Sequence, residues 1–148
     1  IVRFIWGFGF FWTFRVFWFV WFTSNLRDIW FASIIWLRGQ FSFFSFHIDH
    51  IISIKHGGKT NKENLALTCP ICNVNKGSDI ATILENIESP VRFFNPRIDI
   101  WTNHFELDDS GVITSKTDIG AATIKILDLN HIDSIIERQE LIRRGLIK

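Results

Sequence analysis

The stretch from Phe46 to Ile83 constrains the fold more than any other part of the chain, because strand, turn and helix signals follow one another there in a fixed order. Polar and apolar residues alternate from His47 and then give way to an apolar pair, as in a short strand. Two consecutive glycines indicate a turn, since glycine adopts backbone conformations that other residues avoid. The predicted elements are a strand at 47–52, a loop containing Gly57 and Gly58, a second strand at 64–68, a tight knuckle at Cys69–Cys72, and a helix from Asn73 to about Glu88.

Composition divides the chain near Phe46. Residues 1–46 hold 13 of the 16 Phe and 6 of the 7 Trp, whereas residues 47–148 have the balance of an ordinary globular domain. The run from Phe4 to Phe22 is long enough to cross a bilayer as a helix, but its Trp residues are spread along the run instead of lying at the two interfaces. We therefore expect residues 1–46 to be a mis-called reading frame or a fragment, with an unusual membrane anchor as the alternative.

Charge and cysteine content give weaker constraints. The formal net charge of +1 offers no global argument for a nucleic-acid partner. Locally, lysines at positions 55, 59, 62 and 76 outnumber the acidic residues between 47 and 77, which favours a phosphate-facing patch, although lysines that only solubilise a loop give the same pattern. The two cysteines stand in one Cys-x-x-Cys and cannot form a disulfide framework, so we expect a reducing cytoplasm in which thiolates can bind metal.

The ordered set DHI, HGGKT, ENLAL and CPICNVNKG, within residues 47–80, resembles the HNH endonuclease family, whose catalytic unit is a ββα-metal finger. By this resemblance Asp49 is a metal ligand on the first strand and His50 is the general base. Asn64 corresponds to the middle Asn, which braces the loop and helps to orient His50. Asn73 takes the place of the last His of the family name, so the expected triad is His, Asn, Asn.

These residue types suit the chemistry that the resemblance implies. A phosphodiester resists attack because its oxygens are negative, so a hard divalent cation must neutralise charge on the phosphate and the leaving oxygen. Asp49 and Asn73 offer oxygen ligands, which suit Mg²⁺ or Mn²⁺. A neutral His50 can take a proton from the attacking water. The expected partner is nucleic acid, by family precedent double-stranded DNA cut to 5′-phosphate and 3′-hydroxyl ends, and the alternative is a non-catalytic or degenerate nucleic-acid-binding module.

Cys69 and Cys72 resemble one half of a structural zinc site that many family members build from two such knuckles. The other half is expected upstream, and no Cys precedes Cys69, so Zn²⁺ is a possible cofactor for which only half a site is present. His56, Lys59 and Lys76 are the candidate contacts to nucleic acid. A solvated loop residue is the alternative for His56.

The expected architecture is therefore α+β, a small ββα-metal (His-Me finger) core at 47–89 carrying a C-terminal extension of a hairpin and helices at 90–148, after the aromatic segment 1–46. Residues 91–130 resemble, more weakly, the extension of one bacterial branch of the family. A hairpin is predicted around Asp108–Gly111, with a helix capped by Thr117 and running to about Leu129. A last helix is expected to be capped by Asn130, with Ile132, Ile135, Ile136, Gln139 and Ile142 on its inner face.

Overall fold

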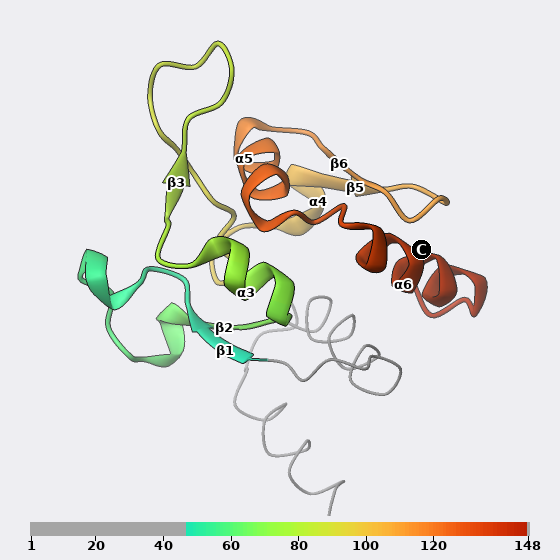
Figure 1. The fold of residues 1–148 in the computed structure, drawn as a ribbon, viewed down its shortest axis with the longest axis horizontal. Helices are drawn as coiled ribbons and strands as arrows, with labels where there is room; N and C mark the ends of the chain where they lie inside the picture. Colours follow the sequence, from blue (N-terminus) through green and yellow to red (C-terminus); the bar gives the residue numbers. More distant parts are fainter. Residues whose placement is uncertain (1–46, 148) are drawn as a thin grey trace, which may run out of the picture.

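The computed structural model describes residues 47–147. Within this range the chain is α+β, which confirms the predicted class: short strands pair into three two-stranded antiparallel sheets, and helices pack beside them (Figure 1). The predictions made for residues 1–46 lie outside the described residues. None of the helices between 47 and 147 is long and apolar enough to cross a membrane.

The first sheet pairs two short strands, as the alternating pattern predicted, with His47 opposite Thr68 and His50 opposite Leu65. The connection between the strands is folded by two short 3-10 helices. It closes beside the end of the first strand, where the N–H of Ile51 donates to the carbonyl oxygen of Asn64 at 2.8 Å. The elements of this part are β1 (His47–His50), η1 (Ile54–His56), η2 (Lys62–Asn64) and β2 (Leu65–Thr68).

The helix that follows, α3 (Pro70–Lys76), begins and ends earlier than predicted. Cys69 caps it, because its Sγ accepts a hydrogen bond from the backbone N–H of Cys72 at 3.3 Å, and proline is well suited to the first helical position. The predicted knuckle is therefore the cap and first turn of α3. The predicted continuation to about Glu88 is wrong, because Gly77 adopts a φ of 50° and a ψ of −125° and thereby ends the helix.

The next segment forms a small sheet and a turn that lead into the extension. A loop between β3 (Ala81–Thr82) and β4 (Val91–Arg92) projects away from the neighbouring elements (Figure 1). At the end of β4, the guanidinium of Arg92 binds both carboxylate oxygens of Asp99, at 2.6 and 2.8 Å, and so holds the turn before α4 (Trp101–His104).

The predicted hairpin and the helix after it are both confirmed. β5 (Phe105–Leu107) pairs with β6 (Ile113–Ser115), and α5 (Asp118–Leu127) begins after Thr117, whose side chain accepts from the N–H of Gly120. Gly120 lies so close to the carbonyl oxygen of His104 that a Cβ there would collide with it. The same Cβ would lie 3.2 Å from Cβ of Ser115 on β6, so α5 packs directly against the hairpin.

The predicted cap of the last helix, α6 (Ile132–Arg143), is wrong, and so is most of its predicted inner face, of which only Ile135 and Ile142 are half-buried. His131 is the capping residue, while the side chain of Asn130 bridges both backbone groups of Ile113, accepting from its N–H at 2.9 Å and donating to its carbonyl oxygen at 2.8 Å. The buried residues of α6 are Ser134, Arg138 and Leu141, and Ile132, Ile136 and Gln139 are exposed. Arg138 is drawn inward because its Nε donates to the carbonyl oxygen of Gly111 at 2.5 Å.

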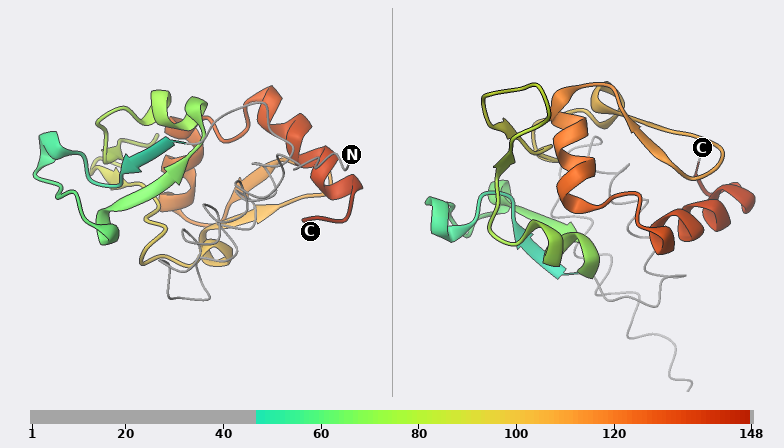
Figure 2. Two further views of the ribbon diagram at one scale, coloured as in Figure 1. Left: turned by 90° about the horizontal axis from the view of Figure 1, so that it is seen from below. Right: turned by 45° about the horizontal axis from the view of Figure 1, so that its top comes forward.

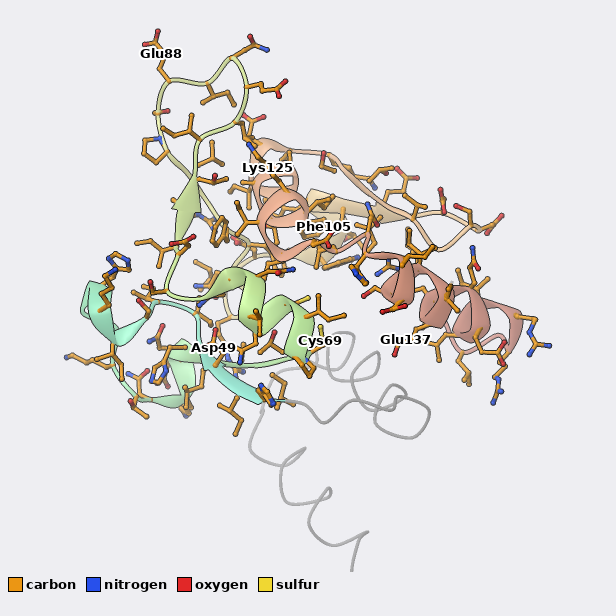
Figure 3. The ribbon with its side chains drawn as sticks, viewed as in Figure 1. Asp49, Cys69, Glu88, Phe105, Lys125 and Glu137 are labelled. Atoms are coloured by element: carbon orange, nitrogen blue, oxygen red, sulfur yellow. The ribbon has the colours of Figure 1, made fainter. Side chains whose placement is uncertain are left out.

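The apolar core lies in the extension. It is built on Phe94, Phe105 and Ile113, and Trp101 stacks on Phe105 with ring centroids 4.1 Å apart. Figure 3 shows Phe105 beside α5. Neither β1 nor β2 contains a buried residue, so this sheet depends on α3, which packs beside α5 (Figure 2).

Candidate active site

Polar contacts between two pairs of side chains join β1 to α3. His47 and Asp49 are two positions apart on the strand and so share one face, and Asn73 and Lys76 are neighbours along one face of the helix. The Nζ of Lys76 donates to Oδ2 of Asp49 at 2.9 Å, and Nδ2 of Asn73 lies 3.1 Å from Nδ1 of His47. Figure 3 shows Asp49 on the strand below α3. One face of β1 is therefore cross-linked to one face of α3.

His50 is held by its backbone and by its ring. Nζ of Lys76, which donates to Asp49, also donates to the backbone carbonyl oxygen of His50 at 2.8 Å. Its ring nitrogen Nε2 lies 2.9 Å from Oγ1 of Thr60, which is in the connection between η1 and η2. The imidazole is thus directed toward the loop, while the neighbouring carboxylate of Asp49 is directed toward α3.

The side chain of Asn64 fixes the loop that carries Thr60. Its Oδ1 accepts from the N–H of Ile52 at 2.8 Å, and its Nδ2 donates to the carbonyl oxygens of Ile52 at 2.8 Å and Lys59 at 2.9 Å. Gly58 packs into the same contact, where a Cβ would collide with the carbonyl oxygen of Ile52. Asn64 therefore ties the residues just after β1 to the far side of the loop.

The two oxygen donors expected to bind a catalytic cation fit a hard metal ion by their chemistry, but each already has a protein partner. Asp49 is bound by Lys76 through Oδ2, and Asn73 is directed toward His47. Within residues 47–147, no three His, Cys, Asp or Glu side chains gather so as to hold a metal ion. Oxygen ligands for Mg²⁺ or Mn²⁺ would therefore come from one carboxylate, an amide and water, a combination that Mg²⁺ accepts.

The half zinc site stays incomplete in the described part of the chain. Cys69 and Cys72 lie together in the cap and first turn of α3, where the sulfur of Cys69 accepts a hydrogen bond from the backbone N–H of Cys72. Figure 3 labels Cys69 at the start of this helix. A structural zinc ion needs four ligands, and residues 47–147 supply no third His, Cys, Asp or Glu beside these two. The described residues therefore do not fit a structural zinc ion.

The three candidate contacts to nucleic acid differ in exposure. His56 and Lys59 are exposed on the loop between β1 and β2. The side chain of Lys76 is only 12% exposed, and its ammonium is committed to Asp49 and His50. His56 and Lys59 can therefore meet a ligand without rearrangement, whereas Lys76 would first have to leave its partners.

Sequence reasoning missed two residues of this constellation. Thr60 was not singled out, because a threonine in a polar loop gives no periodic signal; its place one residue after Lys59 in a glycine-containing loop was the available hint. His47 was left without a role, although its position two residues before Asp49 puts both on one strand face.

Asp49, His50 and Lys76 also line a cleft of about 470 Å³, shared with Phe93 and Phe94 of the extension.

Comparison with known proteins confirms the resemblance seen in the sequence. Residues 39–79 match the family model described as HNH endonuclease. This segment contains every candidate site residue from Asp49 to Lys76, and it extends from ahead of β1 to just past α3. No curated protein and no solved structure matches the chain. An HNH domain implies a nuclease or other nucleic-acid-related function, and such nucleases generally use divalent metal ions.

Proposed function

We propose that this chain is a metal-dependent endonuclease that hydrolyses phosphodiester bonds in DNA, with His50 as the general base and β1, β2 and α3 as a ββα-metal core. The observation that carries the proposal is that the adjacent residues Asp49 and His50 line one cleft and that each is held there by a hydrogen bond. Asp49 faces α3, while the His50 ring faces the loop held by Asn64. Two adjacent residues of one strand thus offer a ligand oxygen and a proton acceptor to the same cleft.

Asp49 and Asn73 would hold a Mg²⁺ or Mn²⁺ ion, and such an ion, when bound, neutralises charge on the phosphate and the leaving oxygen. Oδ2 of Asp49 is bound by Lys76, and no described residue forms a hydrogen bond with Oδ1. That oxygen is available without breaking the ion pair. Zinc has no part in the proposal.

In the reaction, a neutral His50 takes a proton from a water molecule while the water oxygen forms a bond to phosphorus. The bond from phosphorus to the 3′ oxygen breaks, and the 3′ oxygen takes a proton from solvent. The products are a 5′-phosphate and a 3′-hydroxyl. Asn64 holds the loop so that His50 does not have to be ordered during the reaction, and the exposed His56 and Lys59 supply donors and positive charge for the backbone of double-stranded DNA.

A second candidate is a non-catalytic nucleic-acid-binding module, and one observation favours it. Asp49 is neutralised by the ammonium of Lys76 at 2.9 Å, so β1 and α3 hold together without any metal ion. A domain that has lost its chemistry could keep this contact for stability alone.

Nicking of a supercoiled plasmid separates the two candidates. The full chain should nick DNA with Mg²⁺ or Mn²⁺ and stop when EDTA is added, and Asp49→Ala and Asn73→Ala should each require more metal. Glu88→Ala, an exposed change outside the site, is the matched control. A folded sample that binds DNA but nicks it with neither ion would favour the binding module.

A further inference from the structure

Thr60 makes a contact with His50 that the family resemblance does not assign. Its Oγ1 lies 2.9 Å from Nε2 of His50, a normal hydrogen-bond distance, although the two residues are ten positions apart. Thr60 is itself exposed, and it stands between η1 and η2. A contact between an exposed loop hydroxyl and a ring on the neighbouring strand needs a loop of defined shape.

The loop has that shape because the residues on both sides of Thr60 are anchored. The carbonyl oxygen of Lys59, just before it, accepts from Nδ2 of Asn64 at 2.9 Å. The side chain of Asn61, just after it, caps η2 by accepting from the N–H of Asn64 at 3.1 Å. Backbone on each side of Thr60 is therefore fixed by the same residue, Asn64, and the threonine hydroxyl is held against the ring.

We propose that Thr60 is a positioning residue that fixes the ring and the tautomer of His50, an inference that rests on the proposed function for its catalytic consequence. A neutral imidazole has one donor nitrogen and one acceptor nitrogen. With Nε2–H donating to Oγ1 of Thr60, the lone pair of Nδ1 is the proton acceptor. No hydrogen bond from a residue in the described range engages Nδ1.

The proton transfers balance with this assignment. Nδ1 takes the proton of the attacking water as the bond from oxygen to phosphorus forms, and His50 becomes an imidazolium. Nε2–H donates to Thr60 before and after the transfer, so the ring keeps its orientation throughout. The opposite assignment, with Thr60 donating to Nε2, would put a hydrogen on Nδ1 and leave no base.

Long-range nitrogen–proton NMR of His50 in the full chain tests the tautomer independently of activity, so it still reports if the chain proves not to be a nuclease. At a pH where the ring is neutral, we expect the Nε2–H tautomer in the wild type. Thr60→Val should introduce the Nδ1–H tautomer, and Thr60→Ser should restore the wild-type spectrum. A wild-type ring with its hydrogen on Nδ1, or a Thr60→Val spectrum identical to the wild type, would overturn the assignment.

Single-turnover nicking tests the positioning role. Thr60→Val should lower the maximal rate by about 10- to 100-fold, the usual effect of removing a residue that orients another functional side chain, with little change in the DNA concentration for half-maximal rate. Thr60→Ser should recover most of the loss. Thr102→Val, an exposed threonine outside the site, is the matched control. Equal rates for Thr60→Val and wild type, or no recovery with serine, would contradict the role.

Discussion

The ammonium of Lys76 lies 2.9 Å from the carboxylate of Asp49 and 2.8 Å from the carbonyl oxygen of His50. One side chain from α3 thus holds both candidate catalytic residues of β1. The sequence suggested that Lys76 would face nucleic acid, as lysines usually remain solvated. The side chain of Lys76 instead points inward and links α3 to β1. The sheet of β1 and β2 has no buried residue of its own.

Loss of this link should destabilise the fold. We expect Lys76→Met to lower the free energy of unfolding by about 1–3 kcal/mol, because a partly buried carboxylate and a carbonyl oxygen lose their donor. Urea unfolding at neutral pH measures the change. In the double variant with Asp49→Asn the cost should be less than the sum of the two single costs, since the lone charge is gone. Strictly additive costs would show that Asp49 and Lys76 do not interact.

Gly58 and Gly57 should respond to alanine for different reasons. At Gly58 the added Cβ collides with the carbonyl oxygen of Ile52, so Gly58→Ala should displace the loop and cost about 1–3 kcal/mol. Gly57 has open space but a φ of 83°, so Gly57→Ala should cost about 1–2 kcal/mol through backbone strain alone. Only Gly58→Ala should also lower nicking by the folded protein. Equal nicking by both variants would argue against the close approach of Gly58 to Ile52.

Asn64 uses both ends of its amide, so replacement by aspartate should not preserve its contacts. We expect Asn64→Asp and Asn64→Ala each to cost about 1–3 kcal/mol in urea unfolding, because the carbonyl oxygens of Ile52 and Lys59 lose their donor. Asn103→Ala, at an exposed position, is the control. A fully stable Asn64→Asp protein would mean that the amide N–H donors contribute nothing.

The parts of the fold that could be predicted from sequence were those governed by local rules. Asp108 organises the hairpin turn by accepting from the N–H groups of Ser110 and Val112, each at 2.9 Å, and Thr117 caps α5. Both contacts are made within a few residues, so the local pattern suffices. The end of α3 was predicted wrongly because the backbone of Gly77 leaves the helical region. A glycine inside an apolar pattern does not by itself show that a helix ends there.

The sequence suggested which residues to consider as a candidate site, but not the contacts that they make. The order of Asp49, His50, Asn64 and Asn73 could be read along the chain. The partners of these residues depend on how β1 meets α3 and on the path of a long loop, and neither leaves a periodic signal. The inner face of α6 was mostly predicted wrongly for a related reason: hydrogen bonds from the buried Arg138 to Gly111 and Asn130 outweigh the isoleucines that an apolar pattern would turn inward.

The ion pair between Arg92 and Asp99 predicts a pH dependence of stability. Hydrogen bonds from the Arg92 guanidinium hold the pKa of Asp99 below its usual value. A lowered folded-state pKa contributes stability above the unfolded pKa of about 4, and this stability is lost as pH falls through the folded value. Asp99→Asn should therefore melt at a lower temperature than the wild type at pH 7, with the gap closing below about pH 4. A gap that stays constant between pH 7 and pH 3 would contradict this role.

The central claim, that His50 is the base of a metal-dependent nuclease, is tested most directly by single-turnover plasmid nicking at saturating Mg²⁺ with His50→Ala. The rate should fall by about 10²- to 10⁴-fold while DNA affinity changes little, because a general base acts on the chemical step. His131→Asn, which keeps a capping side chain at the start of α6, should cut like the wild type. Wild-type cutting by a folded His50→Ala protein would contradict the claim.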